Sequence, residues 1–243
     1  MKKYILIYFL FYGLCFILAA ADCRGQSVVQ RTVNLESSIP AEKDIFYFDF
    51  THRFTVSRGP SYKAINYPTF ILAFGAFDNT EIKLRYASNS ELVPSLPNEM
   101  EVMAKYNFFN PGAASDLSIA AAPAYNFTTK SFDGIIPVEW RMSKELKTII
   151  NITWLGNSVK NNAFEVLLGA GIVYYLEEKI SVSIDANNLL TSPVWGFGLN
   201  FEIPRSPHTL SLQITDASTN TIQGSAFKTN DLRYGFEFTI KFY

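Results

Sequence analysis

Apolar and polar residues alternate along most of the chain after residue 43. The stretch DIFYFDFTHRFTV, residues 44–56, has aromatic or apolar residues at most even positions, from Phe46 to Val56, and mostly polar residues between them. A period of two places successive side chains on opposite faces of a β-strand. The pattern therefore predicts a strand with one apolar face and one polar face.

The same alternation recurs through the rest of the chain. It is clear at residues 80–88, 134–142, 145–155, 179–187, 194–203, 209–215 and 231–243, and less regular at residues 68–77, 100–109, 117–127 and 164–175. None of these segments has the 3.6-residue period of an amphipathic helix. The sequence predicts an all-β protein of about twelve strands.

Two architectures accommodate strands with one apolar face: a soluble sandwich, which buries that face, and a membrane barrel, which exposes it to lipid. The connections favour the barrel. The long polar stretches SRGPSYKAIN, SNSELVPSLPN and DASTNTIQGSAFKTND alternate with short ones such as DNT and SKE. Long outer loops and short periplasmic turns are typical of outer-membrane barrels. We therefore predict an up-and-down antiparallel transmembrane β-barrel over residues 44–243, surrounded by the lipid of a bacterial outer membrane.

The N-terminus resembles an export signal. Two lysines precede an apolar run from Tyr4 to Leu18, and three alanines follow it. This order is typical of a secretory signal peptide, and the run is shorter than the roughly 20 apolar residues that cross a bilayer. We predict a signal peptide over residues 1–21, with cleavage after Ala21.

Residues 22–43 form a polar segment before the first strand, and two interpretations of it stay open: it plugs the barrel, or it reaches a periplasmic partner. Its Cys23 is the one cysteine left after cleavage, so no internal disulfide is expected. The formal charge is −1, and it becomes −3 when Lys2 and Lys3 leave with the signal peptide. A nucleic-acid partner is not expected, because such proteins are usually basic.

The chain ends in DLRYGFEFTIKFY, a strand that is aromatic on one face. Its apolar positions are Tyr234, Phe236, Phe238, Ile240 and Phe242. This ending resembles the C-terminal signal of Gram-negative outer-membrane proteins, although Tyr243 lies one residue beyond the pattern. The resemblance implies the barrel-assembly machinery as a partner.

Three further stretches, FDFTHRF, PNEMEVMAKYNFF and the gapped SLQIT to FEFTIKF ending, resemble an uncharacterised outer-membrane barrel family of the Bacteroidota. The resemblance covers most of the chain after the signal peptide. It implies the barrel fold and the membrane location, and it supplies no activity.

The two histidines offer little enzyme chemistry. His52 falls on the lipid-facing side of the first strand, and His208 follows Ser206 at a spacing of two. Twelve-stranded outer-membrane phospholipases use a histidine and a serine at this spacing in the opposite order, and a third partner is missing here. We expect no catalytic residue, metal site or cofactor, and keep a lipid-modifying enzyme as an alternative.

Glycines and prolines mark special places in the wall. The GAG of residues 169–171 and the GFG of residues 196–198 carry lumen-facing glycines, which either let the strands curve or leave room for a plug. Pro123 and Pro137 fall inside neighbouring strands and are predicted to lie nearly opposite each other. They indicate either a paired bulge or a weak point through which an apolar ligand leaves sideways, as in a carrier.

The polar faces of the strands predict the lining of the lumen. The ionisable residues on these faces are Asp49, Arg53, Glu81, Lys83, Arg85, Glu101, Lys105, Glu139, Arg141, Lys147, Glu165, Asp185, Glu202, Arg233, Glu237 and Lys241. A strongly selective channel would show a ring of one sign, whereas these residues mix both signs. The sequence predicts a small, weakly selective channel for polar solutes, or a structural barrel whose lumen is closed by salt bridges.

Overall fold

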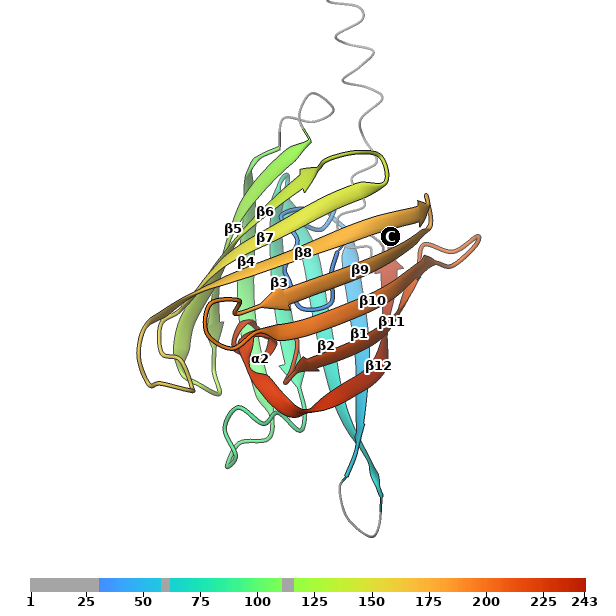
Figure 1. Ribbon diagram of the computed structural model, residues 1–243. Helices are drawn as coiled ribbons and strands as arrows, with labels where there is room; N and C mark the ends of the chain where they lie inside the picture. Colours follow the sequence, from blue (N-terminus) through green and yellow to red (C-terminus); the bar gives the residue numbers. More distant parts are fainter. Residues whose placement is uncertain (1–30, 58–61, 111–115) are drawn as a thin grey trace, which may run out of the picture.

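The computed structural model describes residues 31–57, 62–110 and 116–243. Its strands form one closed antiparallel barrel in which each strand pairs with its sequence neighbours and β1 pairs with β12 (Figure 1). The elements are β1 Phe46–Val56, β2 Ala64–Phe77, β3 Thr80–Ala87, β4 Glu99–Phe109, β5 Leu117–Asn126, β6 Ser131–Arg141, β7 Leu146–Leu155, β8 Glu165–Glu177, β9 Ile180–Asn187, β10 Val194–Glu202, β11 Thr209–Ala217, α2 Ile222–Ala226 and β12 Lys228–Phe242. The predicted up-and-down barrel of twelve strands is confirmed.

The first and last strands close the ring. Phe46 pairs with Phe242, and the register continues to Phe54 opposite Tyr234. Closure leaves no strand edge with unpaired backbone groups, which a barrel in lipid requires. The aromatic faces of both strands lie on the outside, where Phe46 stacks on Phe74 of β2.

The two ends of the barrel differ. Tight turns at residues 78–79 and 178–179 lie at the end where the described chain finishes, and the connections at residues 88–98, 156–164 and 218–227 lie at the other. Short turns face the periplasm in outer-membrane barrels. We therefore call these the periplasmic end and the outer end.

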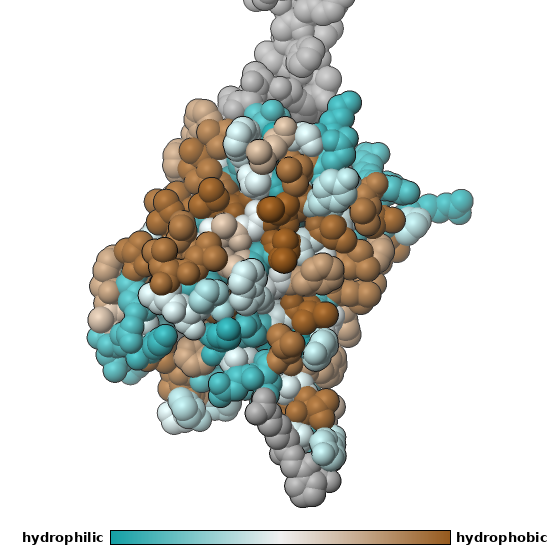
Figure 2. Space-filling view, in the orientation of Figure 1, coloured by the Kyte–Doolittle hydropathy of each residue, from teal (hydrophilic) through white to brown (hydrophobic). Residues whose placement is uncertain are grey.

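The wall is apolar outside and polar inside. Exposed large side chains alternate along the strands with buried polar or charged ones, as in β3, where Ile82, Leu84 and Tyr86 are exposed and Lys83 and Arg85 are buried. Figure 2 shows hydrophobic side chains over much of the strand wall and hydrophilic ones gathered toward the ends. This orientation suits a barrel with lipid around it. Among the described residues, no helix is long and apolar enough to cross a membrane.

The prolines are not placed as predicted. Pro123 pairs with Gly134 of β6, whereas Pro137 pairs with Asn151 of β7, so the two prolines are not opposite each other. The ladder between β5 and β4 lacks paired residues beside Pro123, between Met103 and Tyr106, whereas its register shifts only between Asn107 and Phe109. Proline lacks the N–H that a ladder hydrogen bond needs, which accounts for an interruption on one side of each proline.

Other boundaries shift slightly. β2 begins at Ala64 and β12 at Lys228, so both are longer than predicted, and the connection between β11 and β12 contains the short helix α2. Thr221 caps this helix by accepting a hydrogen bond from the Gly224 N–H. The predicted signal peptide, residues 1–21, lies outside the described residues.

Candidate functional site: a lumen filled from both ends

Residues 31–43, which we call the plug segment, run inside the barrel (Figure 1). The segment is attached at the periplasmic end, where Lys43 forms an isolated bridge with Gly75 of β2. The Asp44 N–H donates to the Gly75 carbonyl at 2.8 Å, and Asp44 has a φ of 62°. Asp44 therefore adopts a left-handed backbone conformation at the point where the chain passes from the plug segment to the first strand.

From this attachment the segment crosses toward β3, β4 and β5. The Ala41 N–H donates to Glu81 at 2.7 Å. Ser38 lies 2.9 Å from Ser118, oxygen to oxygen, and its carbonyl accepts from the Asn107 amide at 2.9 Å. The Ser38 N–H also donates to Glu139 of β6 at 3.3 Å.

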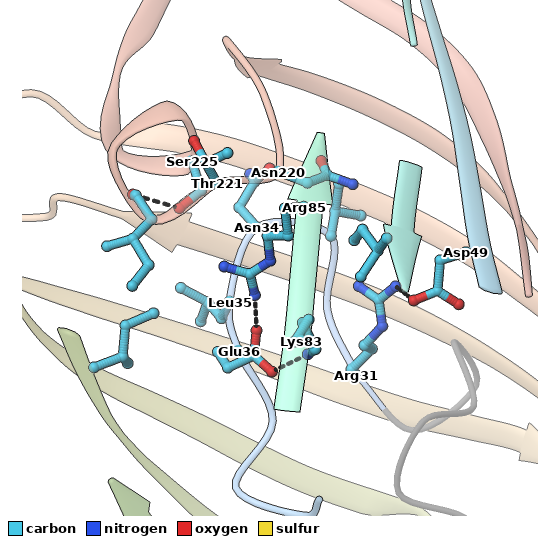
Figure 3. Close-up of a pocket in the computed structure, with 14 residues that line it drawn as sticks. Arg31, Asn34, Leu35, Glu36, Asp49, Lys83, Arg85, Asn220, Thr221 and Ser225 are labelled. Carbon is cyan, nitrogen blue, oxygen red and sulfur yellow. Dashed lines mark hydrogen bonds and ion pairs between the residues drawn. The ribbon is translucent and has the colours of Figure 1, made fainter. Parts of the chain in front are cut away.

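Glu36 enters the largest charge cluster of the lumen. Its Oε1 lies 2.7 Å from Lys83 Nζ and 2.8 Å from Lys105 Nζ, and its Oε2 contacts Arg85 Nη2. Figure 3 shows the Glu36 carboxylate between Lys83 and Arg85. Burial disfavours the charged form of Glu36, but the nearby cations outweigh burial and hold its pKa well below the usual value.

The segment continues to the opposite wall. Asp185 of β9 accepts from the Val33 N–H at 2.8 Å and from both the backbone and the side-chain N–H groups of Asn34. Arg31 then contacts Glu237 of β12 and lies 3.9 Å from Asp49 of β1. The plug segment therefore contacts strands all around the ring.

Glycines make room for this segment. A Cβ at Gly169 would lie 2.6 Å from Leu35, and one at Gly171 would lie 3.0 Å from Thr32. On β10, a Cβ at Gly196 would lie 2.6 Å from the Asn34 side-chain nitrogen. The glycines of the GAG and GFG stretches thus lie directly against the plug segment, which agrees with the interpretation that they leave room for a plug.

The outer end is filled by residues 218–227, which we call the mouth loop and which contain α2. Thr219 and Thr221 both donate to the buried Glu99 of β4. The Ile222 N–H donates to Glu101 at 2.9 Å, and Gln223 donates to Asp133 of β6 at 3.1 Å. The wall carboxylates near the outer end therefore hold the mouth loop.

A small cavity separates the plug segment from the mouth loop. Its volume is about 30 Å³, and its lining includes Glu36, Lys83 and Arg85 below and Asn220 and Thr221 above (Figure 3). A cavity of this size has room for one or two water molecules. The plug segment and the mouth loop therefore leave little free space between them in this conformation.

A larger cavity of about 230 Å³ lies near the outer end, beside the mouth loop. It is lined by residues of several outer loops, among them Leu92, Ser158, Lys160 and Asn188, together with Gln223. Gln223 also accepts from the Val159 N–H at 3.1 Å, so this side chain joins the mouth loop to the connection between β7 and β8.

Most of the predicted lumen residues lie inside the barrel. Those that are buried are Asp49, Arg53, Glu81, Lys83, Arg85, Glu101, Lys105, Glu139, Lys147, Asp185, Arg233 and Glu237. Four predicted residues lie closer to the ends of their strands, where Arg141 is exposed and Glu165, Glu202 and Lys241 are partly exposed. Side chains at the strand ends are accessible to water, so alternation no longer implies burial there.

The wall pairs many of these charges directly. Glu81 is opposite Lys105, and Arg85 is opposite Glu101, across the register of β3 and β4. Lys147 lies 3.4 Å from Glu139 on the neighbouring strand. Cross-strand pairs of opposite sign are the geometry expected to stabilise a sheet.

Four charged residues of the site were not predicted. Glu99 and Asp133 lie just before the segments in which alternation was recognised, and extending each strand by one residue would have found them. Arg31 and Glu36 lie in an irregular segment without a repeat, so periodicity carries no signal for them.

The histidines lie apart from these clusters. His52 stacks on Phe54 and Phe236 of the outer face, with ring centroids at 5.7 and 5.4 Å, and its Nδ1 lies 2.7 Å from the Asn66 side chain. His208 lies in the turn between β10 and β11, near Phe238. Among the described residues, no group of three histidine, cysteine or acidic side chains is placed to hold a metal ion.

Comparison with known proteins places the fold in one class. No protein-family model matches the chain, and no curated protein matches it. Solved outer-membrane porins do match the structure: a KdgM porin in complex with disordered oligogalacturonate shares 9% identity over 81% of this chain and 99% of its own, with a TM-score of 0.55. The NanC porin shares 8% identity over 81% of this chain and 100% of its own, also with a TM-score of 0.55.

These identities show the fold alone. The protein has the fold of small outer-membrane porins: a closed barrel of twelve antiparallel strands with an apolar exterior. A barrel of this kind is a structure of the bacterial outer membrane.

Proposed function

We propose that the protein is an outer-membrane channel for small polar solutes, and that the plug segment holds it closed in the conformation described here. One observation carries the proposal: the segment that fills the lumen is not part of the wall. The ring closes through β1 and β12 without it. Movement of residues 31–43 would therefore open space inside the barrel while the wall stays paired.

The inner wall suits an aqueous path. Its buried acids are Asp49, Glu81, Glu99, Glu101, Asp133, Glu139, Asp185 and Glu237, and its buried bases are Arg53, Lys83, Arg85, Lys105, Lys147 and Arg233. Hydrogen bonds and ion pairs hold most of the plug segment, and water can replace such contacts when a segment leaves. Because both signs are present, we expect weak selectivity rather than the strong selectivity of a single-sign ring.

A structural barrel without transport is the second candidate. The closure of the lumen from both ends and the pairing of its charges favour this role. A permanently closed barrel would never conduct, however the plug segment is released. The two candidates therefore differ in one measurable property.

A carrier of apolar ligands has one observation in its favour. An apolar cluster lines the lumen beside β5, and it includes Met103, Ala122 and Ile222. The ladder between β4 and β5 lacks paired residues at the same place. Ile222 and Ala226 of the mouth loop fill this region, so we rank this role below the channel.

We propose no catalytic role. The surroundings of His52 are aromatic, and it lies on the face that we assign to lipid. A lipid-modifying enzyme would need a nucleophile and an orienting partner beside the base. Unchanged lipid hydrolysis after His52→Ala and His208→Ala would exclude an enzyme that depends on either histidine.

A disulfide that locks the plug segment tests the channel. Ser38 and Ser118 have oxygens 2.9 Å apart, so cysteines at both positions are well placed to join. The double variant Ser38→Cys with Ser118→Cys, made with Cys23→Ser, is refolded into planar bilayers. We expect no current when it is oxidised, and openings after reduction.

The variant Ser118→Cys, also made with Cys23→Ser, is the control, and its current should not respond to the redox state. Silence of the reduced double variant, with heat-modifiable mobility showing a folded barrel, would favour the structural role. Equal currents in both redox states would show that the plug segment does not close the path.

A further inference from the structure

We infer that the place occupied by Glu36 is a carboxylate-binding site, and that carboxylate-bearing solutes are the substrates that take it when the plug segment leaves. The substrate assignment rests on the proposed channel function. The binding site itself rests on contacts within the lumen. In the closed conformation, Glu36 is in effect a ligand tethered to the chain.

The geometry fits a carboxylate with both of its oxygens engaged. One oxygen of Glu36 is shared by Lys83 and Lys105, at 2.7 and 2.8 Å, and the other faces the Arg85 guanidinium (Figure 3). Charge-assisted hydrogen bonds of this kind are among the stronger polar contacts in proteins. The three cations come from the adjacent strands β3 and β4, so the wall itself fixes their spacing.

Without Glu36, the contact group around Lys83, Arg85 and Lys105 has fewer carboxylates than cations. On the wall, Glu81 contacts Lys83 at 2.9 Å and Lys105 at 3.4 Å, and Glu101 contacts Arg85 at 2.6 Å. Among the contacts of the described residues, three cations thus share two wall carboxylates, and Glu36 supplies the third. When the plug segment leaves, one positive charge in this contact group loses its partner.

The positive excess in this contact group favours an anion at this position. Arg31 leaves with the same segment, so Glu237 and Asp49 on another part of the wall lose a cation at the same time. A neutral solute leaves the charge unpaired, and a cationic solute is repelled by it. A solute carboxylate restores the neutral cluster and the hydrogen bonds that Glu36 made. The preference therefore follows from the same contacts that hold the lumen closed.

A further cation, apart from the three that contact Glu36, lies on the route from the outer end. Arg53 of β1 is buried, and within the described part of the chain its Nε and Nη1 have no hydrogen-bond partner. Arg85 pairs with Ile71, and Ile71 pairs with Asp49, so these residues lie on one line of paired residues across the wall. Arg53 lies four residues nearer the outer end than Asp49. An anion that enters from outside would meet unused donors of Arg53 before it reaches the Glu36 site.

Thiol labelling tests the site without requiring transport. Ser38 is buried in the closed conformation, so a cysteine there reacts with a maleimide only when the plug segment moves. The variant Glu36→Gln with Ser38→Cys and Cys23→Ser removes the tethered carboxylate. A ligand that binds the vacated site shifts the equilibrium toward the open conformation and speeds labelling.

The probes are D-glucuronate and D-glucose, which differ by one carboxylate. We expect glucuronate to raise the labelling rate by about tenfold at saturation, the scale of a hydrogen bond to a charged group. Glucose should leave the rate unchanged. Adding Lys105→Gln should abolish the response, whereas Lys144→Gln, at an exposed lysine in the turn between β6 and β7, should preserve it.

Equal rates with both sugars, or a glucuronate response that survives Lys105→Gln, would overturn the site. Heat-modifiable mobility confirms folding of each variant. A selective labelling response in a protein that never conducts would keep the carboxylate site and reject the channel. Conduction without a selective labelling response would keep the channel and reject the carboxylate site.

Discussion

Asp185 of β9 and Asn34 of the plug segment are joined by two hydrogen bonds, one to each carboxylate oxygen. The Asn34 N–H lies 3.1 Å from Oδ2, and the side-chain Nδ2 lies 2.9 Å from Oδ1. Oδ2 also accepts from the Val33 N–H. One wall carboxylate thus holds two consecutive residues of the segment on the side of the lumen away from Glu36.

Asp185→Asn should loosen this end of the plug segment. An amide can accept on one atom only, so at least one N–H of Val33 or Asn34 loses its partner, at a cost of about 1–3 kcal/mol. We expect faster hydrogen exchange at the Val33 and Asn34 amides, measured by mass spectrometry. Asp133→Asn, which affects Gln223 of the mouth loop, is the matched control and should leave these amides protected.

Gly75→Ala should displace the attachment of the plug segment. An added Cβ would lie 2.0 Å from the Glu42 carbonyl oxygen, so the backbone of residue 42 must move. We expect several-fold faster maleimide labelling of Ser38→Cys in the Cys23→Ser background. Phe74→Leu, on the opposite face of the same strand, should leave the rate near that of the parent; if both variants behave alike, the clash at Gly75 is not the cause.

The low pKa of Glu36 predicts how closure depends on pH. The group contributes fully above the ordinary glutamate pKa, about 4.3, and its contribution is lost only as pH falls through the lower pKa of the closed conformation. We therefore expect Glu36 to add no pH dependence to the open probability in planar bilayers from about pH 7 to about pH 5, and to promote opening in stronger acid.

The groups that face Glu36 are the cations Lys83, Arg85 and Lys105, and the wall carboxylates Glu81 and Glu101 contact the same cations. Glu36→Gln isolates the contribution of Glu36 from those of Asp185 and Glu237, because it should lower the size of the acid-induced rise. An acid-induced rise of the same size in Glu36→Gln and in the unaltered protein would contradict the assignment.

The exposed Ile150 lies in the middle of β7, on the face that we assign to lipid. Ile150→Arg should lower the free energy of unfolding by about 2–4 kcal/mol, the cost of arginine near the bilayer midplane. Leu232→Arg, close to the outer start of β12, should cost about 0–1 kcal/mol. Urea unfolding in lipid vesicles measures both, and equal losses would argue against this membrane position.

The strands could be predicted because their polarity repeats every two residues. Phe48 and Phe50 alternate with Asp49 and Thr51, and the wall requires this order wherever lipid lies outside and polar groups lie inside. The lumen residues followed from the same phase. Alternation did not predict that Arg141 is exposed, because the pattern continues to the residue at which the strand ends.

The contents of the lumen could not be predicted in the same way. Glu36 lies in a segment whose conformation is set by partners on many strands, and local sequence carries no record of those contacts. α2 is five residues long, too short for a helical period to be recognised, and it lies in a stretch that is mostly polar. Only Gly169 and its counterparts hinted at a plug, because a wall needs small residues where another chain lies close.

The pairing of β1 with β12 has a consequence for biogenesis. The plug segment precedes β1 in the chain, yet it contacts β9 and β12, which are synthesised long after it. These contacts can form only after the late strands have joined the wall, so filling of the lumen is completed at the end of barrel assembly.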